Sequence, residues 1–272
     1  MPEEYLKNCP LLRDTSFMNL MVRRICNVLI IANPYDAFML EHDGRADEKI
    51  FDEYAKLGLR YPPRFFQVAS AREADEELRN TSFDLVICMP GAEDNDVFDI
   101  ARSIKERFRE IPLVVLTPFS HGITRRMENE DLSIFEYVFC WLGNTDLLIS
   151  IIKLIEDKMN LEHDVNEAGV QMILLVEDSI RYYSSILPYL YRFVLRQSLE
   201  FATEALNSQL EMLRMRGRPK IVLARNYEEA WELYTRYKDQ TLGVISDCRF
   251  PRGGVTDELA GFDLLSAMRR ED

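Results

Sequence analysis

The order of strand-like and helix-like segments, which the chain shows twice, constrains its fold more than any other feature. Short apolar segments of strand length alternate with longer segments whose apolar residues have helical spacing. The predicted strands cover residues 27–31, 64–68, 84–88, 113–117 and 137–141 in the first half, and residues 172–176, 220–224 and 242–246 in the second. Strands that alternate with helices in this way predict parallel sheets with helices on both faces.

Length and repeat together predict the domain organisation. The 272 residues are enough for two domains of ordinary size. We expect an N-terminal helical lead over residues 1–24, a first α/β domain over residues 25–160 and a second over residues 161–272. The second domain is C-terminally incomplete in this prediction, because the repeat supplies only its first three strands.

Composition argues against several classes of protein. A net charge of −13 disfavours direct binding to nucleic acid, since neutralising phosphates requires clustered Lys and Arg. Five scattered cysteines without a CxxC pair are typical of a reduced compartment, and neither a signal sequence nor a bilayer-length apolar stretch is evident. We therefore predict a cytoplasmic protein that binds neither nucleic acid nor membrane. One basic group is interpreted as a solvated helix end: Arg214, Arg216, Arg218 and Lys220.

Three carboxylates follow two of the predicted strands. Glu177 and Asp178 come directly after strand 172–176, and Asp247 comes directly after strand 242–246. The carboxyl ends of parallel strands meet at one edge of a sheet, so these side chains are expected to converge. Crowded carboxylates repel one another unless a cation lies among them, and an all-oxygen site suits Mg²⁺. Polar residues also occur at strand ends simply because loops begin there, but three at one edge favour a metal site.

These residues resemble those of receiver domains in the response-regulator superfamily. In that family strand one ends in an acidic pair, strand three ends in the phosphoacceptor Asp, and a Pro follows that Asp by four positions. The segment ILLVEDS supplies Glu177 and Asp178, and the segment DCRFP supplies Asp247 and Pro251. The resemblance implies two flavodoxin-like, doubly wound parallel sheets of strand order 2-1-3-4-5. The second sheet is then truncated after its third strand and helix, with an extended first helix.

The resemblance also implies a chemistry. Asp247 would accept a phosphoryl group, while Asp178, Asp247 and the backbone carbonyl of Arg249 hold Mg²⁺ and Glu177 acts on the ion through water. The phosphodonor would be a sensor histidine kinase or a phosphotransfer protein. The Ser or Thr and the Lys that complete the site in the family fall at positions beyond residue 272. Such a chain is a regulatory module of two-component type and not itself an enzyme.

The first copy departs from the family pattern at every acidic position. Ala32 and Asn33 stand where the acidic pair would be, and Met89 stands where the phosphoacceptor would be. Cys140 replaces the strand-five Lys, and only Thr117 matches a switch position. We predict a pseudo-receiver that cannot be phosphorylated.

A second resemblance concerns the region after the first strand of the second copy. The segments SIRYYSSILPYLYRFVLRQ, RMRGRPKIVLA and ISDCRFPRGG are similar to the receiver-like N-terminal region that precedes phosphoenolpyruvate-synthase-like (pyruvate, water dikinase) chains. Neither the ATP-grasp half nor the phosphohistidine segment of that enzyme is present. This resemblance implies a regulatory front end whose catalytic body lies outside the chain.

Two other functions stay open. A helix is expected over residues 189–215, with Pro188 kinking or restarting it near its beginning. Leucines recur along it at every seventh residue: Leu199, Leu206 and Leu213. This spacing fits a purely structural module that forms a homodimer through the helix, unless the helix folds back on the first copy. An aspartate-nucleophile phosphatase is disfavoured, because Arg249 occupies the position where a second carboxylate is required.

Overall fold

The computed structural model describes residues 19–33, 46–57, 59, 61–90, 96–118, 131–141, 145–202 and 215–271 of the 272-residue chain. The chain divides into two compact units within helix α8 (Asp146–Ala168). The first unit comprises residues 24–152, and the second unit joins residues 153–272 to the described residues that precede position 24. In the predicted N-terminal lead, the described residues 19–24 contain no α-helix, and residues 1–18 lie outside the described part.

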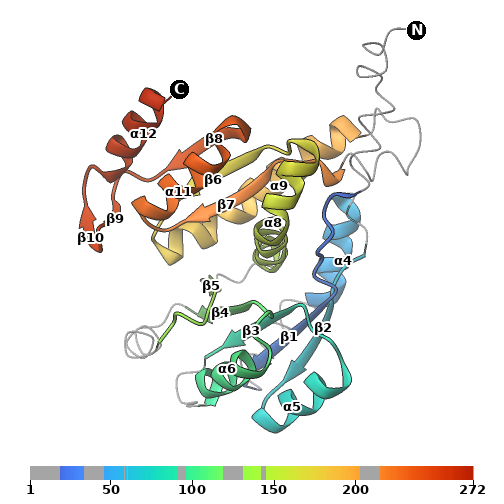
Figure 1. The fold of residues 1–272 in the computed structure, drawn as a ribbon. Coiled ribbons are helices and arrows are strands. Elements are labelled where there is room, and N and C mark those ends of the chain that lie inside the picture. The colour runs from blue at the N-terminus through green and yellow to red at the C-terminus, as the bar shows by residue number, and fades with distance from the viewer. Residues whose placement is uncertain are drawn as a thin grey trace, which may run out of the picture. The chain divides into compact units, whose positions relative to one another are not determined.

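The first unit is built on a sheet of five parallel strands in the order β2-β1-β3-β4-β5 (Figure 1). The strands are β1 (Asn27–Ala32), β2 (Arg64–Val68), β3 (Leu85–Met89), β4 (Leu113–Pro118) and β5 (Tyr137–Trp141). The helices of this unit are α4 (Ala46–Lys56), α5 (Ala71–Asn80), α6 (Asp96–Arg107) and the first part of α8. The predicted α/β class and the strand order 2-1-3-4-5 are therefore confirmed for the first copy.

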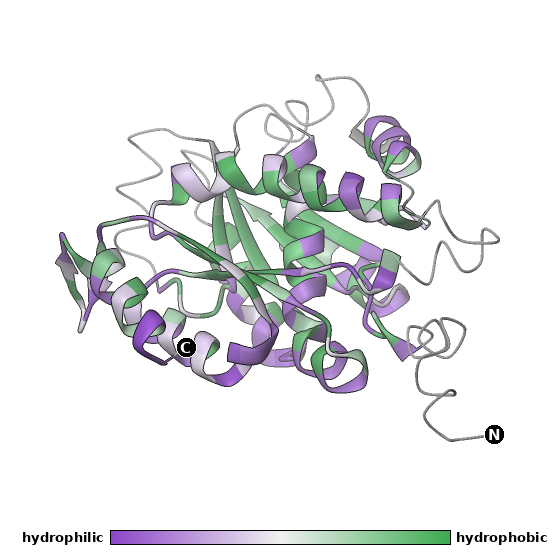
Figure 2. Ribbon diagram, turned by 90° about the horizontal axis from the view of Figure 1, so that it is seen from above, coloured by the Kyte–Doolittle hydropathy of each residue, from purple (hydrophilic) through white to green (hydrophobic). Residues whose placement is uncertain are grey.

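Local sequence explains why these segments fold as they do. Strand β3 reads LVICM and every residue is buried, as expected of a central parallel strand covered on both faces. Helix α5 begins at a reciprocal cap, in which Glu73 N–H donates to Ser70 Oγ (3.3 Å) and the Glu73 carboxylate accepts from Ala69 N–H (2.8 Å). Figure 2 shows the outcome: the strands are mainly hydrophobic, whereas the helices carry both hydrophobic and hydrophilic residues.

The second unit contains a smaller sheet of three parallel strands in the order β7-β6-β8. Its elements are β6 (Met172–Val176), α9 (Ile180–Ala202), β7 (Lys220–Ala224), α11 (Tyr227–Tyr237), the 3-10 helix η2 (Lys238–Gln240), β8 (Thr241–Ser246) and α12 (Ala260–Glu271). Strand β6 pairs in parallel with both of its neighbours. The predicted strands of the second copy are confirmed, and they lie in the order that the first three strands have in the first sheet.

A β-hairpin separates β8 from α12, in a segment that is not among the predicted strands. Strand β9 (Phe250–Arg252) pairs antiparallel with β10 (Val255–Asp257). The turn between them contains Gly253 and Gly254, whose φ angles of +61° and +79° are ones that residues with side chains rarely adopt. Two glycines with positive φ are what a tight hairpin turn requires. The glycines therefore close a hairpin.

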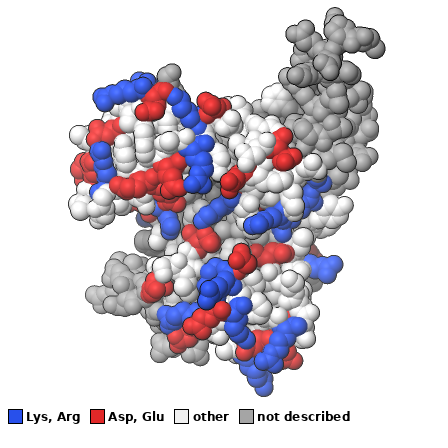
Figure 3. All heavy atoms as spheres, in the orientation of Figure 1, with Lys and Arg blue, Asp and Glu red and all other residues white. Residues whose placement is uncertain are grey.

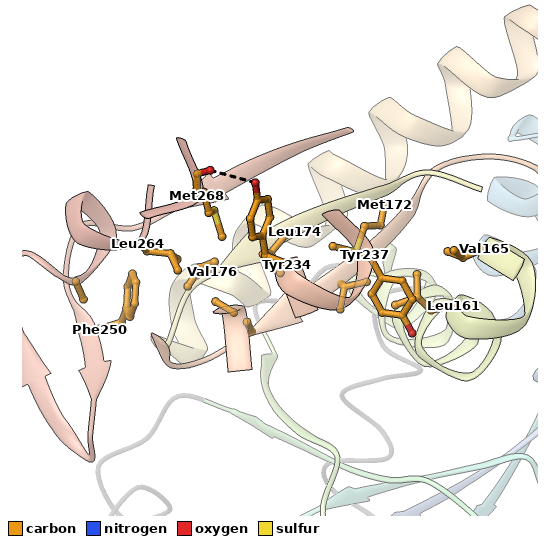
Figure 4. Close-up of a cluster of buried hydrophobic side chains, with 14 residues drawn as sticks. Leu161, Val165, Met172, Leu174, Val176, Tyr234, Tyr237, Phe250, Leu264 and Met268 are labelled. Atoms are coloured by element: carbon orange, nitrogen blue, oxygen red, sulfur yellow. Dashed lines mark hydrogen bonds between the residues drawn. The ribbon is translucent and has the colours of Figure 1, made fainter. Parts of the chain in front are cut away.

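Helices α11 and α12 pack on one face of the second sheet and bury its core. Figure 4 shows Met172, Leu174 and Val176 of β6 within this cluster of buried side chains. Tyr234 of α11 donates its hydroxyl hydrogen to the carbonyl of Met268 in α12 at 3.3 Å. The two helices are thus tied to each other as well as to the sheet.

Helix α9 runs from Ile180 to Ala202 and contains Pro188 inside it. Of the two predicted effects of Pro188, a restart of the helix is therefore wrong, and a kink stays a prediction. Proline removes one backbone hydrogen bond from a helix, and the burial of Tyr183, Leu187 and Tyr191 on the same side offsets that loss.

The predicted helix over residues 189–215 is described only in part. Residues 203–214 lie outside the described part, and among its three regularly spaced leucines only Leu199 is described. The homodimer through this helix stays a prediction.

Two findings bear on membranes and nucleic acids. In the described part of the chain, no helix is both long enough and apolar enough to cross a bilayer. On the face drawn in Figure 3, acidic and basic side chains are interspersed over the described surface of each unit. That surface presents no extended basic patch of the kind that duplex binding requires.

The second half of α8 carries polar residues that are buried rather than solvated. Asp157 is fully buried and accepts two hydrogen bonds from Arg218, at 2.7 and 3.0 Å. Asp164, also fully buried, pairs with Lys220 at 2.7 Å and accepts from the Met21 N–H at 3.0 Å. Arg218 and Lys220 are themselves buried, so the prediction that this basic group is a solvated helix end is wrong for both. The buried carboxylates of α8 provide their counter-charges.

Candidate metal centre

The carboxyl ends of β6 and β8 lie side by side, and the main chain fixes their alignment. Val176 is the register partner of Ser246, and the Asp247 N–H donates to the Val176 carbonyl at 2.9 Å. The Glu177 N–H donates to the carbonyl of Ala224, the last residue of β7, at 3.0 Å. The residues that follow these strands therefore share one edge of the sheet.

This alignment brings together the three carboxylates that the sequence predicts to converge. One oxygen each from Glu177, Asp178 and Asp247 lies within 4.8 Å of the other two. Glu177 is buried, Asp178 is partly exposed and Asp247 is exposed. The cluster therefore has a buried side and a side that solutes can reach.

Short-range hydrogen bonds orient two of the three carboxylates. Glu177 Oε1 accepts from the Ser179 N–H at 3.0 Å. Asp247 Oδ1 accepts from the Cys248 N–H at 2.7 Å. Each bond engages one oxygen of its carboxylate and limits the rotation of the group.

Burial and mutual repulsion both act on the charges of the cluster. Burial raises the pKa of Glu177, and the charges of Asp247 and Asp178 raise it further, against the hydrogen bond from Ser179. Burial also raises the pKa of Asp178, as does the charge of Asp247, while the charge of Arg249 lowers it. Carboxylates held this way favour a counter-ion among them, and a donor set made only of oxygen fits a hard cation such as Mg²⁺.

Arg249, whose backbone carbonyl the resemblance assigns to the metal, lies in the loop between β8 and β9. Its exposed guanidinium pairs with exposed Glu258, with 3.3 Å between Nη1 and Oε1. Its positive charge also acts on Asp178. The side chain thus belongs to the electrostatic surroundings of the cluster, and the role of its carbonyl stays a prediction.

The hairpin that follows this loop is fastened to both neighbouring helices. Arg252 donates to Asp263 of α12 at 2.9 Å, and its guanidinium carbon lies 4.3 Å from the centre of the Tyr227 ring of α11. The Gly253 N–H donates to Glu228 of α11 at 2.9 Å. These contacts fix the far end of the segment that runs from Asp247 to the hairpin. No local sequence signal predicts contacts between residues so far apart in the chain.

Gly261 is a further residue that the sequence does not single out. Its N–H, in the first turn of α12, donates to the Cys248 carbonyl at 2.9 Å. A Cβ at this position would lie 2.1 Å from the carbonyl oxygen of Asp247. Only glycine lets α12 lie this close to the segment that carries Asp247. Nothing in one sequence distinguishes this glycine from the others.

The corresponding strand ends of the first unit carry no carboxylate. Ala32 at the end of β1 is the register partner of Met89 at the end of β3, and both are buried. Asn33 follows Ala32. Burial raises the pKa of the neighbouring Cys88 thiol to about 12, so the thiol stays protonated and packs as an apolar side chain. The described residues at the ends of β1 and β3 thus offer neither a carboxylate nucleophile nor a ligand set for a hard cation.

Thr117 and Cys140 of the first unit, which the family resemblance singles out, also lie side by side. Thr117 of β4 is the register partner of Cys140 of β5, and both side chains are buried.

No protein-family model and no curated protein matches the chain. The geometry of the two strand edges is therefore the basis for any functional proposal.

In the absence of a cation, the carboxylate cluster is expected to destabilise the second unit as the pH rises through the carboxyl range. The pKa values of Glu177 and Asp178 are raised in the folded state, so protons bind more tightly there than in the unfolded state. The contribution of these two groups to stability is present in full below the pKa that they have in the unfolded chain. It is lost as the pH rises through the pKa that they have in the folded chain. Asp178→Asn should reduce this loss, measured as the urea midpoint at several pH values in divalent-free buffer.

The matched control for this measurement is Asp239→Asn. Asp239 is exposed in η2 and lies outside the cluster, so its substitution should keep the pH slope of the wild-type chain. Identical slopes for wild type and Asp178→Asn would show that the carboxylates are not coupled as described.

Proposed function

We propose that the second unit is a Mg²⁺-dependent receiver domain that accepts a phosphoryl group on Asp247. The observation that carries the proposal is the convergence of Glu177, Asp178 and Asp247, with an oxygen of each within 4.8 Å of the others. The strand order β7-β6-β8 supports it, because it matches the first three strands of a flavodoxin-like sheet.

Asp247 is the nucleophile in this proposal. Asp247 is exposed and Glu177 is buried, so a donor has better access to Asp247. One carboxylate oxygen of Asp247 attacks phosphorus, and the bond from phosphorus to a nitrogen or oxygen of the donor breaks. The donor leaves with that electron pair, and the product is an acyl phosphate on Asp247.

The donor set fits the ion that this chemistry needs. Asp178 and Asp247 would hold Mg²⁺ together with the Arg249 carbonyl, and Glu177 would act on it through water. When bound, Mg²⁺ neutralises the charge that builds up on the phosphoryl oxygens during transfer.

The first unit is a pseudo-receiver in this proposal. Ala32, Asn33 and Met89 supply no group that can accept a phosphoryl group or bind Mg²⁺, so the unit serves as a structural or docking module. The whole chain is then a regulatory signalling module of two-component type, whose donor is a sensor histidine kinase or a phosphotransfer protein. The resemblance to the region ahead of phosphoenolpyruvate-synthase-like chains supports a role as the front end of such an enzyme.

Asp247→Asn is expected to abolish both Mg²⁺ binding and phosphorylation. Asparagine keeps the size of the side chain but has neither the charge that holds the ion nor a carboxylate nucleophile. In the wild-type chain, Mg²⁺ at tenfold excess over its Kd should raise the free energy of unfolding by about 1.4 kcal/mol. Acetyl phosphate with Mg²⁺ should add the mass of one phosphoryl group, read by intact-protein mass spectrometry. The variant should show neither effect.

Asp239→Asn is again the matched control and should keep both effects. Equal stabilisation of wild type and Asp247→Asn by Mg²⁺ would show that the ion binds elsewhere. A wild-type chain that gains no phosphoryl group would favour the alternative, a purely structural module that dimerises through the helix predicted over residues 189–215.

A further inference from the structure

An open cavity of about 730 Å³ lies along α11, beside Arg252 of the hairpin. The hairpin contacts the first turn of α11 there (Figure 1). A cavity of this size is large enough for a small-molecule ligand. None of the three clustered carboxylates is among its lining residues, so the proposed receiver chemistry leaves the cavity unused. The lining residues that decide its chemistry are Tyr227, Glu228, Trp231, Glu232, Arg236 and Arg252.

The floor of the cavity is aromatic. Tyr227 and Trp231 lie four residues apart and therefore on one face of α11. Both residues are partly buried and pack against the hydrophobic core of the unit. Trp231 also contacts the ring of buried Tyr234, with 5.9 Å between the ring centres. The core thus holds both rings from inside, and their remaining surface faces the cavity.

One ring of this pair already carries a planar cation. The guanidinium carbon of Arg252 lies 4.3 Å from the centre of the Tyr227 ring. The face of an aromatic ring attracts positive charge, and tryptophan attracts it more strongly than tyrosine does. Among the described residues, no lysine or arginine lies over the ring of Trp231. Trp231 is therefore a second ring at which a cation can bind.

The charges around the cavity favour a cation over an anion. Both of its guanidiniums already pair with carboxylates: Arg252 with Asp263 at 2.9 Å, and Arg236 with Glu232 at 3.0 Å. The carboxylate of Glu228 adds a further negative charge to the lining. Three carboxylates thus accompany two guanidiniums that are already neutralised. A positively charged ligand is attracted to such a surface, whereas an anion is repelled.

We propose that this cavity binds a planar organic cation of the guanidinium or amidinium type, which stacks on Trp231 with Glu228 and Glu232 as its counter-charges. The stacking of Arg252 on Tyr227 is the structural precedent. A planar cation is favoured over a compact ammonium, because it can lie flat on the indole while the N–H groups at its edge donate to carboxylates. The proposal does not depend on phosphoryl transfer in the carboxylate cluster.

The test uses the full chain with ¹⁵N only in its tryptophans. The chain has two tryptophans and therefore two indole N–H signals, which a Trp141→Phe variant assigns. Benzamidinium should shift the Trp231 signal saturably and leave the signal of Trp141, in the first unit, unchanged. Benzamide, its neutral isostere, should bind at least about tenfold more weakly, and benzoate more weakly still. Equal affinities for benzamidinium and benzamide, or an unshifted Trp231 signal, would overturn the proposal.

Two double variants make the test specific. Glu228→Gln with Glu232→Gln removes both counter-charges at similar side-chain size and should weaken benzamidinium binding by about tenfold. Both residues are exposed, so the urea midpoint should stay close to that of the wild type. Glu162→Gln with Glu167→Gln, at exposed positions of α8, changes the net charge equally and should keep the wild-type affinity. An equal loss in both would show that net charge attracts the cation, and not the cavity.

A peptide, acetyl-Gly-Arg-Gly-amide, tests the source of the cation with the same Trp231 signal. Binding at least as tight as that of benzamidinium would assign the cation to an arginine side chain of a partner. Much weaker binding would assign it to a free aromatic cation, whose ring covers more of the indole. Either result supports the proposal, since both place a planar cation on Trp231. A control peptide with glutamine in place of the arginine should leave the signal unchanged, and an equal shift with it would overturn the proposal.

Discussion

Asp157→Ala is expected to lower the free energy of unfolding of the second unit by about 3–5 kcal/mol. Asp157 is fully buried and accepts two hydrogen bonds from Arg218. It also accepts from the Tyr191 hydroxyl at 2.9 Å and from the Ile221 backbone N–H at 3.0 Å. Alanine would remove the acceptor of all four bonds and leave the guanidinium charge buried beside them. A buried charge without its partner is what makes the expected effect large.

Deprotonation of Arg218 does not remove the cost of this buried charge. Burial alone would lower the pKa of Arg218, but the charge of Asp157 and the hydrogen bonds to it outweigh burial and raise that pKa above its ordinary value. Even without Asp157, a guanidinium stays protonated at neutral pH. Combining Asp157→Ala with Arg218→Met should therefore recover much of the lost stability, because an apolar pair can replace a buried ion pair at little cost.

Urea unfolding followed by the fluorescence of Trp231 measures this effect. The chain has two tryptophans, and since Trp141 lies in the first unit, a Trp141→Phe background reports on the second unit alone. Glu232→Ala is the control, because it breaks an exposed ion pair with Arg236 and should cost less than about 0.5 kcal/mol. A loss for Asp157→Ala no larger than that of the control would contradict a stabilising role for the buried bonds.

The strands could be predicted nearly to the residue because their signal is local. A parallel strand covered on both faces must be a continuous apolar run, and the run over residues 172–176 is strand β6. The run over residues 27–31 gives β1, which continues by one residue to Ala32. Neither prediction needs knowledge of any distant residue.

Polar side chains that pair across the fold could not be predicted in the same way. Arg218 and Lys220 are basic residues in a basic segment, and by themselves they favour an exposed surface. Their burial depends on carboxylates of α8, and Arg218 meets Asp157 across 61 residues of sequence. That pairing exists only once β7 lies beside the helix.

The candidate metal centre depends partly on local sequence and partly on contacts between residues that are distant in the sequence. Glu177, Asp178 and Asp247 could be expected to converge because parallel strands share a carboxyl edge. The close contact of α12 at Gly261 depends on which elements meet in space, and so do the contacts of Arg252 in the hairpin. No spacing in the sequence indicates either of them. The convergence of the three carboxylates was therefore predictable, and the packing that holds them in place was not.

Gly261→Ala is expected to impair both the stability of the second unit and the Mg²⁺ binding that we propose for it. The new methyl group would lie 2.1 Å from the Asp247 carbonyl oxygen and 3.0 Å from the Cys248 Cα. Both neighbours are backbone atoms that cannot rotate away, so either α12 or the segment carrying Asp247 must move. Overpacking of this kind costs about 1–3 kcal/mol. We expect the segment carrying Asp247 to move relative to Glu177 and Asp178, so Mg²⁺ affinity should fall by about 10–100-fold, as it does when groups supporting a metal ligand are changed.

The effect on Mg²⁺ affinity can be distinguished from the effect on stability if affinity is measured under conditions in which the variant is fully folded. Isothermal titration well below the urea or thermal midpoint compares folded chains only, so a lower affinity there reports the geometry of the cluster and not the fraction unfolded. Gly243→Ala is the matched control, since a Cβ at Gly243 of β8 would meet no heavy atom within 4 Å. It should bind Mg²⁺ as the wild type does. A Gly261→Ala chain that is destabilised yet binds Mg²⁺ with unchanged affinity would mean that the displaced element is α12, and that Asp247 keeps its position without it.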